Sequence, residues 1–340
     1  MDQINLWLVG GGLLVGAVFA IPLQRFRFCL VSGISNVLLI KDTRLMVAFS
    51  VALLVAITGT QYLEMMDIVA IGDSSYRDAT LDWLGAGAGG FLFGTGSALA
   101  GGCITRTLVR TMEGSLHSLI VFVSFAVVAA IIQFGFLETF RINLTHATAI
   151  ELTTDAGIAS ILSWPSWLVL AIAVAVLLLV LYKSWQLSPN KSMLAVGAIV
   201  GGLVVVSWYI TGVLAQDEFE PMKPSAMTMS GPLARFGYFL ISGRLAGLSF
   251  AVSFVIGTAL ASFLLALVSH QFKITAPAKG MVKMALLGGS LMGLGAIMAY
   301  GCNVGQGLSG ISTLSMESLI AVAGMVTGIT LVTKWLERFS

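Results

Sequence analysis

Three cysteines carry the most distinctive chemistry in this sequence. Two of them follow a glycine, in the steps Gly102-Cys103 and Gly301-Cys302, and the third is Cys29. A neutral thiol is soft and polarisable and donates a weak hydrogen bond, whereas a thiolate repels anions. A preceding glycine lets the backbone approach a ligand closely. This combination favours binding of a small anion with a soft, sulfur-rich end.

The number and spacing of the cysteines argue against a disulfide framework and against a metal site. Three is an odd number, there is no Cys-X-X-Cys pair, and His117, His146 and His270 form no ligand pattern with a cysteine. Zinc sites normally place such ligands at short, regular spacings. A Walker sequence is also absent, so direct ATP hydrolysis is not expected. We predict a chain without a metal or a cofactor.

The composition predicts a protein embedded in a membrane. Hydrophobic residues make up 57% of the 340 residues and charged residues only 10%, and the mean hydropathy is +0.97. A soluble domain carries roughly a quarter charged residues. The net charge of +2 is too small to favour a nucleic-acid partner. The first apolar run lacks a preceding basic region, so no cleaved signal peptide is expected.

Nine apolar segments are predicted to span the bilayer as helices, because each is near the required ~20 residues. They are 4–21, 45–63, 82–101, 118–138, 166–183, 193–214, 248–269, 281–300 and 317–336. Four shorter apolar pieces are predicted to be re-entrant or half-length helices: 26–40, 103–115, 236–246 and 303–314. Such pieces are tolerated at membrane depth when protein buries them or when they line a cavity. The predicted fold class is an all-α polytopic membrane protein.

Two stretches of the chain match each other at a constant offset of 199 residues, which aligns Cys103 with Cys302. The offset also matches several small residues: Gly89 with Gly288, Gly94 with Gly293, Gly96 with Gly295 and Ala100 with Ala299. In addition, 28–33 resembles 238–243, which pairs Cys29 with Phe239. These matches indicate that the chain contains two related halves.

The halves are predicted to be inverted repeats. We place the first repeat at 1–138, a connector with one transmembrane helix at 139–192, and the second repeat at 193–340. The single connecting helix reverses the direction of the second repeat. Inverted repeats of this kind place a binding site where they meet, near the membrane midplane.

Charged residues outside the spans predict the orientation of the chain. Basic residues gather at 22–44, 183–191, 273–279 and 334–338, and acidic residues gather at 64–81, 151–155 and 217–220. Cytoplasmic loops carry the excess of Lys and Arg in membrane proteins. The alternation predicts an N-terminus outside the cell and a C-terminus in the cytoplasm.

Polar residues near the two Gly-Cys steps extend the candidate site. A helix start presents unpaired N–H groups and a positive dipole end, which favour an anion. Asn303 and Gln306 are of interest because polar side chains at membrane depth are costly and often functional. Four arginines on the predicted cytoplasmic side can gather an anion: Arg25, Arg27, Arg106 and Arg110. The alternatives are cysteines that only pack as small apolar residues, glycines that only allow close helix contacts, and arginines that only set the topology.

Several motifs resemble the YeeE/YedE sulfur-transport family. The stretch 103–120 is similar to the first repeat motif of that family, and 301–314 is similar to the second. Arg27-Phe28-Cys29 resembles its N-terminal cysteine motif. The resemblance covers nearly the whole chain. It implies a permease of the bacterial inner membrane, with an hourglass-like fold of nine spanning helices plus short re-entrant ones, and the best-known members take up thiosulfate.

The resemblance also implies roles for particular residues. In the family, three cysteines near the constriction are proposed to pass thiosulfate along by hydrogen bonds to sulfur. The expected substrate-binding set consists of the matching cysteines and their neighbours: Cys29, Cys103, Cys302, Gly102, Gly301, Asn303 and Gln306. A small cytoplasmic sulfurtransferase of the TusA type is the implied partner. The chain departs from the family at Met112-Glu113, where many relatives carry glycine, and Glu113 changes the charge at the inner mouth.

The leading hypothesis is a transporter, not an enzyme, that imports thiosulfate into the cytoplasm through a central constriction lined by cysteines. One alternative is a transporter or channel for another sulfur or selenium species, such as sulfite, sulfide or a selenium oxyanion. A less favoured alternative is a membrane thiol enzyme or sulfurtransferase, against which the lack of a Cys-X-X-Cys pair argues. A purely structural scaffold would leave the polar pair Asn303 and Gln306 unexplained.

Overall fold

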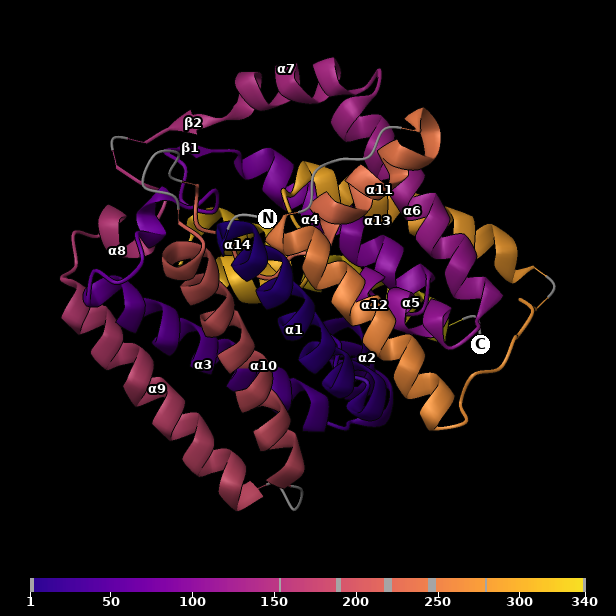
Figure 1. Ribbon diagram of the computed structural model, residues 1–340, viewed down its shortest axis with the longest axis horizontal. Coiled ribbons are helices and arrows are strands. Elements are labelled where there is room, and N and C mark those ends of the chain that lie inside the picture. Colours follow the sequence, from indigo (N-terminus) through magenta and orange to yellow (C-terminus); the bar gives the residue numbers. More distant parts are fainter. Residues whose placement is uncertain are drawn as a thin grey trace.

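Long helices with shorter helices between them make up almost all of the structure (Figure 1). The computed structural model describes residues 3–152, 154–187, 191–216, 222–243, 249–278 and 280–338. Eight stretches of this described part are long and apolar enough to cross a membrane. They contain α1 (Gln3–Phe26), α3 (Arg44–Met65), α6 (Leu116–Phe134), α9 (Ser166–Leu187), α10 (Lys191–Tyr209), α12 (Phe250–Val268), α13 (Met281–Met298) and α14 (Met316–Glu337). The predicted fold class, an all-α polytopic membrane protein, is confirmed.

The ninth predicted span, 82–101, forms α4 (Trp83–Leu99), which has only 17 residues. That length is at the lower end of the roughly 17–25 residues that spanning helices use. α4 packs along both α13 and α14, and its glycines allow the close approach. All nine predicted spanning segments are therefore helical, and the shortest of them lies between two others.

Three of the four predicted short segments form helices where they were expected. They are α2 (Leu30–Ile40), α5 (Ile104–Met112) and the π-helical η3 (Gly305–Gly310). The fourth was expected at 236–246, but α11 runs from Ser230 to Ser242. Pro232 lies in the first turn of α11, where a proline costs no internal helical hydrogen bond. Residues 244–246 of that prediction lie outside the described residues.

The connections also carry elements that the sequence pattern did not predict. α7 (Glu138–Thr148) and α8 (Ile158–Ile161) precede α9, and β1 (Thr80–Leu81) pairs antiparallel with β2 (Ile150–Glu151). In Figure 1, α7 and this two-stranded sheet lie along one edge of the molecule. The remaining short elements are η1 (Ile71–Asp73) and η2 (Ile210–Leu214), a π-helical extension of α10.

α4 and α13 pack against each other through reciprocal glycine contacts. A Cβ added at Gly89 would come within 2.8 Å of the Gly295 carbonyl oxygen, and a Cβ added at Gly288 would come within 2.8 Å of the Gly96 carbonyl oxygen. The second contact is the first one with each residue replaced by its mate 199 positions away. Contacts that exchange in this way are what a two-fold axis between the two helices produces.

The other helix pairs exchange in the same manner. α1 packs along α12 while α3 packs along α10, and α4 packs along α14 while α6 packs along α13. Replacing α1, α3, α4 and α6 by α10, α12, α13 and α14 turns each pair into another observed pair. The ends of α4 and α13 agree as well, because Gly101 (φ 74°) and Tyr300 (φ 52°) both adopt the left-handed conformation.

The predicted match between Cys29 and Phe239 is wrong. Cys29 is the residue before α2, whereas Phe239 lies in the last turn of α11, which Gly243 caps. The residue before α11 is Met229, which lies 200 positions after Cys29. Apolar residues beside a glycine made 28–33 and 238–243 look alike, although one segment begins a helix and the other ends one. By position in the fold, the counterpart of Cys29 is Met229.

Candidate functional site

Two of the three cysteines meet at the centre of the described structure. Cys29 and Cys103 are the residues before α2 and α5, and the Cys29 thiol donates a hydrogen bond to the Cys103 sulfur at 3.1 Å. Both thiols are buried and free. Neither side chain caps its helix with a hydrogen bond. The first-turn N–H groups of two helices thus lie beside a pair of soft sulfur groups.

A small cavity adjoins this thiol pair. Its volume is about 10 Å³, and its polar lining consists of Cys29, Cys103, Thr105 and Asn303. Apolar side chains complete the wall: Phe19, Leu23, Phe28, Leu30, Phe49, Val304 and Leu308. A cavity must offer about 10–15 Å³ to hold one water molecule. The passage beside the thiols is therefore closed to any larger anion until these side chains move apart.

Two of the residues that line this cavity each have a buried polar atom without a partner in the described structure. The Thr105 hydroxyl oxygen and the Asn303 amide oxygen are buried and make no hydrogen bond. Buried polar groups are normally paired, so each such atom needs an explanation. Asn303 was predicted from the sequence, whereas Thr105 was not. A polar residue in the turn directly after Cys103 was the signal that could have found it.

Cys302 occupies the break between α13 and η3 and is completely buried. It does not line the small cavity, although its neighbours Asn303 and Val304 do. Cys302 lies within electrostatic range of both Cys103 and Tyr76. The structure therefore brings Cys29 and Cys103 into contact, whereas Cys302 lies apart from the small cavity, near Cys103 and Tyr76.

Gln306 and Gly301 shape the second Gly-Cys motif. The Gln306 side-chain nitrogen donates to the Ala299 carbonyl at 2.7 Å, and its oxygen accepts from the Ser318 hydroxyl at 2.5 Å. A Cβ added at Gly301 would come within 2.8 Å of Cγ of Gln306, so glycine makes room for that side chain. At Gly102 an added Cβ would meet only Arg106, at an ordinary 3.4 Å. Gln306 thus uses its amide to hold the motif.

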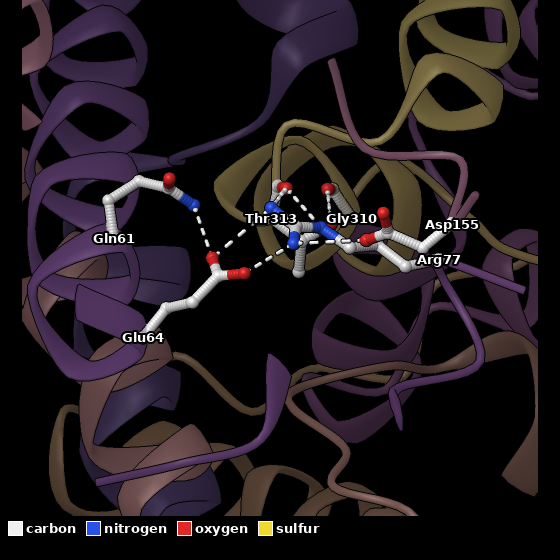
Figure 2. A network of polar contacts seen from close by, with 6 residues as sticks. All are labelled: Gln61, Glu64, Arg77, Asp155, Gly310 and Thr313. Atoms are coloured by element: carbon white, nitrogen blue, oxygen red, sulfur yellow. Dashed lines mark hydrogen bonds and ion pairs between the residues drawn. The ribbon is translucent and has the colours of Figure 1, made fainter. Parts of the chain in front are cut away.

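A buried ion cluster fixes the far end of the second motif (Figure 2). The Arg77 Nε and Nη2 groups both donate to the Thr313 carbonyl, at 2.8 and 2.6 Å. Arg77 also pairs with Glu64 and, at 3.3 Å, with Asp155, and its side chain is only 2% exposed. Gln61 donates to Glu64 at 3.1 Å. These residues come from α3, the loop before β1 and the segment before α8, and sequence reasoning did not predict that they meet.

Aromatic residues close the space near Cys302. Tyr76 lies edge-on to Trp208 at 6.1 Å between ring centroids, and the Trp208 indole N–H donates to the Ser312 hydroxyl at 3.1 Å. Burial raises the pKa of Tyr76, so the phenol stays neutral. Apart from Asn303, the polar side chains described around this motif are mostly paired within the protein.

A charged cavity of about 650 Å³, called here the basic vestibule, shares Leu23 with the small cavity. All four predicted arginines line it, together with one acidic residue: Arg25, Arg27, Arg106, Arg110 and Glu113. Arg106 donates a hydrogen bond to the Ser32 hydroxyl, which ties α5 to α2. Arg106 and Arg27 also line a second cavity of about 450 Å³. The four predicted arginines therefore converge on one cavity.

Proteins with similar sequences include two named as thiosulfate transporters. The chain is 26% identical over 342 residues to the thiosulfate transporter TsuA of Escherichia coli strain K12, an alignment that covers 95% of this chain and 93% of that protein. It is 28% identical over 337 residues to the thiosulfate transporter TsuA of Spirochaeta thermophila, which covers 94% and 97%. A shorter match, 28% identical over 123 residues, covers 34% of this chain and 27% of the probable transporter YedE of Escherichia coli strain K12. The pattern of the sulphur transport family matches residues 25–331, so the chain belongs to the sulphur transport family.

Proposed function

We propose that this protein imports thiosulfate into the cytoplasm through a constriction formed by Cys29 and Cys103. The observation that carries the proposal is the pair of buried thiols at two helix starts, together with Arg27 and Arg106, which are close to these cysteines in the chain and line the basic vestibule. Two relatives that match nearly the whole chain are thiosulfate transporters by name. Thiosulfate is a small dianion with a soft terminal sulfur, which suits both parts of this arrangement.

The constriction and the vestibule have different tasks in the proposed mechanism. The arginines raise the local concentration of an anion through the field of the vestibule. The thiols then donate weak hydrogen bonds to the terminal sulfur, and the absence of a charged side chain among the residues of the small cavity lets the anion leave again. Cys302 continues the path on the other side of Cys103, so the three thiols act as successive donors.

Orientation and repeat structure complete the proposal. The basic vestibule faces the cytoplasm if the N-terminus is outside and the C-terminus inside, as the loop charges predict. Of those charges, Asp217, Glu218, Glu220 and Lys279 lie outside the described residues. The reciprocal contacts of α4 and α13 support inverted repeats at 1–138 and 193–340 joined by a connector at 139–192. A cytoplasmic sulfurtransferase of the TusA type would take over the imported sulfur.

The experiment that tests this function is uptake of radiolabelled thiosulfate into liposomes that hold the purified protein. Uptake above that of empty liposomes, reduced by unlabelled thiosulfate more strongly than by sulfite, sulfide or selenite, is the expected result. A stronger effect of one of those competitors would identify another substrate. A persulfide on a cysteine after turnover, found by mass spectrometry, would instead indicate a membrane sulfurtransferase. The absence of uptake under an imposed ion gradient would contradict the proposal.

A further inference from the structure

The small cavity beside the thiol pair is lined by a hydroxyl and an amide side chain as well as by the thiols. One wall is formed by sulfur groups, while Thr105 and Asn303 add a hydroxyl and an amide. These two side chains are 0% and 3% exposed, and each keeps a polar atom without a partner. An unpaired polar atom in a closed space is normally satisfied by a ligand or a bound water. Both residues line the same cavity, which argues for one shared ligand.

The surroundings of Thr105 explain why its hydroxyl stays available. Helix threonines often donate to the carbonyl four residues earlier, as Thr111 does to Thr107 at 2.8 Å. For Thr105 that carbonyl belongs to Gly101, which lies before α5 in the left-handed conformation and accepts from the Arg110 guanidinium at 3.4 Å. Thr105 is in the first turn of α5, beside Cys103. Its hydroxyl therefore joins the thiol at the same end of the helix.

Resting on the function proposed above, we infer that Thr105 and Asn303 form an oxygen-binding subsite that orients the substrate in the constriction. The Thr105 hydroxyl is a donor. A half-turn of the Asn303 amide about its last bond exchanges the unpaired oxygen for the NH₂ group, which carries two N–H donors. A thiosulfate ion has three oxygens at one end and one sulfur at the other. The subsite binds the oxygens, and the thiols of Cys29 and Cys103 bind the terminal sulfur.

This subsite gives the constriction a basis for discrimination. A soft thiol pair alone would not separate thiosulfate from an oxygen-free sulfur anion. A site built to hydrogen-bond particular groups rejects a ligand that lacks them, because its buried polar atoms are then left unpaired. Thr105 and Asn303 therefore determine specificity for an anion that carries both sulfur and oxygen.

The test measures the KM for thiosulfate uptake of three variants in liposomes. Thr105→Val removes the hydroxyl at nearly constant shape and is expected to raise KM roughly tenfold, the effect of losing one buried hydrogen bond. Thr105→Ser restores the donor and should return KM close to the wild-type value. The matched control is Thr107→Val, because Thr107 is also buried on α5 but does not line the cavity. It should leave KM unchanged.

The outcomes separate this inference from the proposed function. If the wild-type protein takes up thiosulfate and Thr105→Val has the same KM, the subsite is refuted while the transport function stands. An equal loss in Thr105→Ser, or in Thr107→Val, would show that the helix has merely been disturbed, which also refutes the subsite. Asn303→Asp, which adds a negative charge beside the substrate oxygens, should reduce uptake more than Asn303→Gln does. The reverse order would contradict an oxygen-binding role for Asn303.

Discussion

The two Gly-Cys motifs share their backbone conformation but differ in burial and in the charge of their surroundings. The N–H groups of Gly102 and Gly301 bond to carbonyls five residues earlier, both at 2.9 Å, and each motif is preceded by a left-handed residue. The motif after Cys103 then continues as a regular helix with arginines that face a vestibule of about 650 Å³. The motif after Cys302 continues as a fully buried π-helix without a charged side chain.

In the proposed mechanism, this difference lets one fold unit serve two sides of a membrane. The repeated turn supplies one buried cysteine in each half, Cys103 and Cys302. The basic surroundings of the first motif would let an anion enter or leave, whereas paired hydrogen bonds and the ion cluster support the second motif. We expect the second motif to be sensitive to loss of its supports, and the first to changes in its charge.

The largest change in stability is expected from removing the support of the second motif. Arg77→Met leaves Glu64 and Asp155 without their cation and frees the Thr313 carbonyl. Breaking a buried ion pair costs about 3–5 kcal/mol, and the lower end applies because both carboxylates are 25% exposed. Thermal unfolding in detergent, followed by tryptophan fluorescence, would measure the loss.

The matched control for Arg77 is Lys223→Ala. Lys223 pairs with Asp78 at 2.8 Å, but the two side chains are 64% and 49% exposed. Exposed ion pairs contribute about 0–1 kcal/mol. Equal melting temperatures for Arg77→Met and the wild type would show that the cluster does not hold the second motif.

The next largest loss of stability is expected from glycine substitutions at matching positions in the two halves. Gly89→Ala and Gly288→Ala each place a Cβ within 3.0 Å of backbone atoms on the opposite helix. Overpacking of this kind costs about 1–3 kcal/mol, and reciprocal contacts predict similar losses for the two variants. Gly202→Ala on α10, where an added Cβ meets nothing within 4 Å, should cost nothing. Thermal unfolding of all three would test the symmetry, which clearly unequal losses at 89 and 288 would contradict.

The smallest effect concerns the charge of the first motif. Burial raises the pKa of Glu113 in the basic vestibule, so its carboxyl takes up a proton at higher pH than an exposed glutamate does. Lowering the pH toward that pKa removes a negative charge and should lower the KM for thiosulfate. Glu113→Gln should have a lower KM than the wild type, and this KM should no longer decrease as the pH is lowered in this range. Arg110→Gln is the matched control of opposite sign and should raise KM.

The sequence allowed the helices to be predicted, together with the cysteines, the asparagine and the arginines that line the two cavities of the candidate site but not Thr105, and physical reasons explain what was missed. Long apolar runs are strong signals, so all nine segments that were predicted to span form helices in the described part of the chain. The offset of 199 aligned Cys103 with Cys302 because the crossing of α4 and α13 demands glycine at matching positions. Cys29 was paired with Phe239 because similar apolar residues cannot show whether a helix begins or ends there. The contact of Arg77 with Thr313 joins residues 236 positions apart, and no local pattern encodes it.

The most direct test of the account is thiosulfate uptake by variants of the thiol pair and of its counterpart. Cys29→Ala and Cys103→Ala should each lose most of the uptake, because the constriction then lacks a sulfur donor. Met229→Leu changes the residue that stands in the place of Cys29 in the second half, where no thiol is present, and it should retain uptake. Melting temperatures of the three variants would confirm that each is folded. Normal uptake by a folded Cys29→Ala, Cys103→Ala double variant would contradict the account.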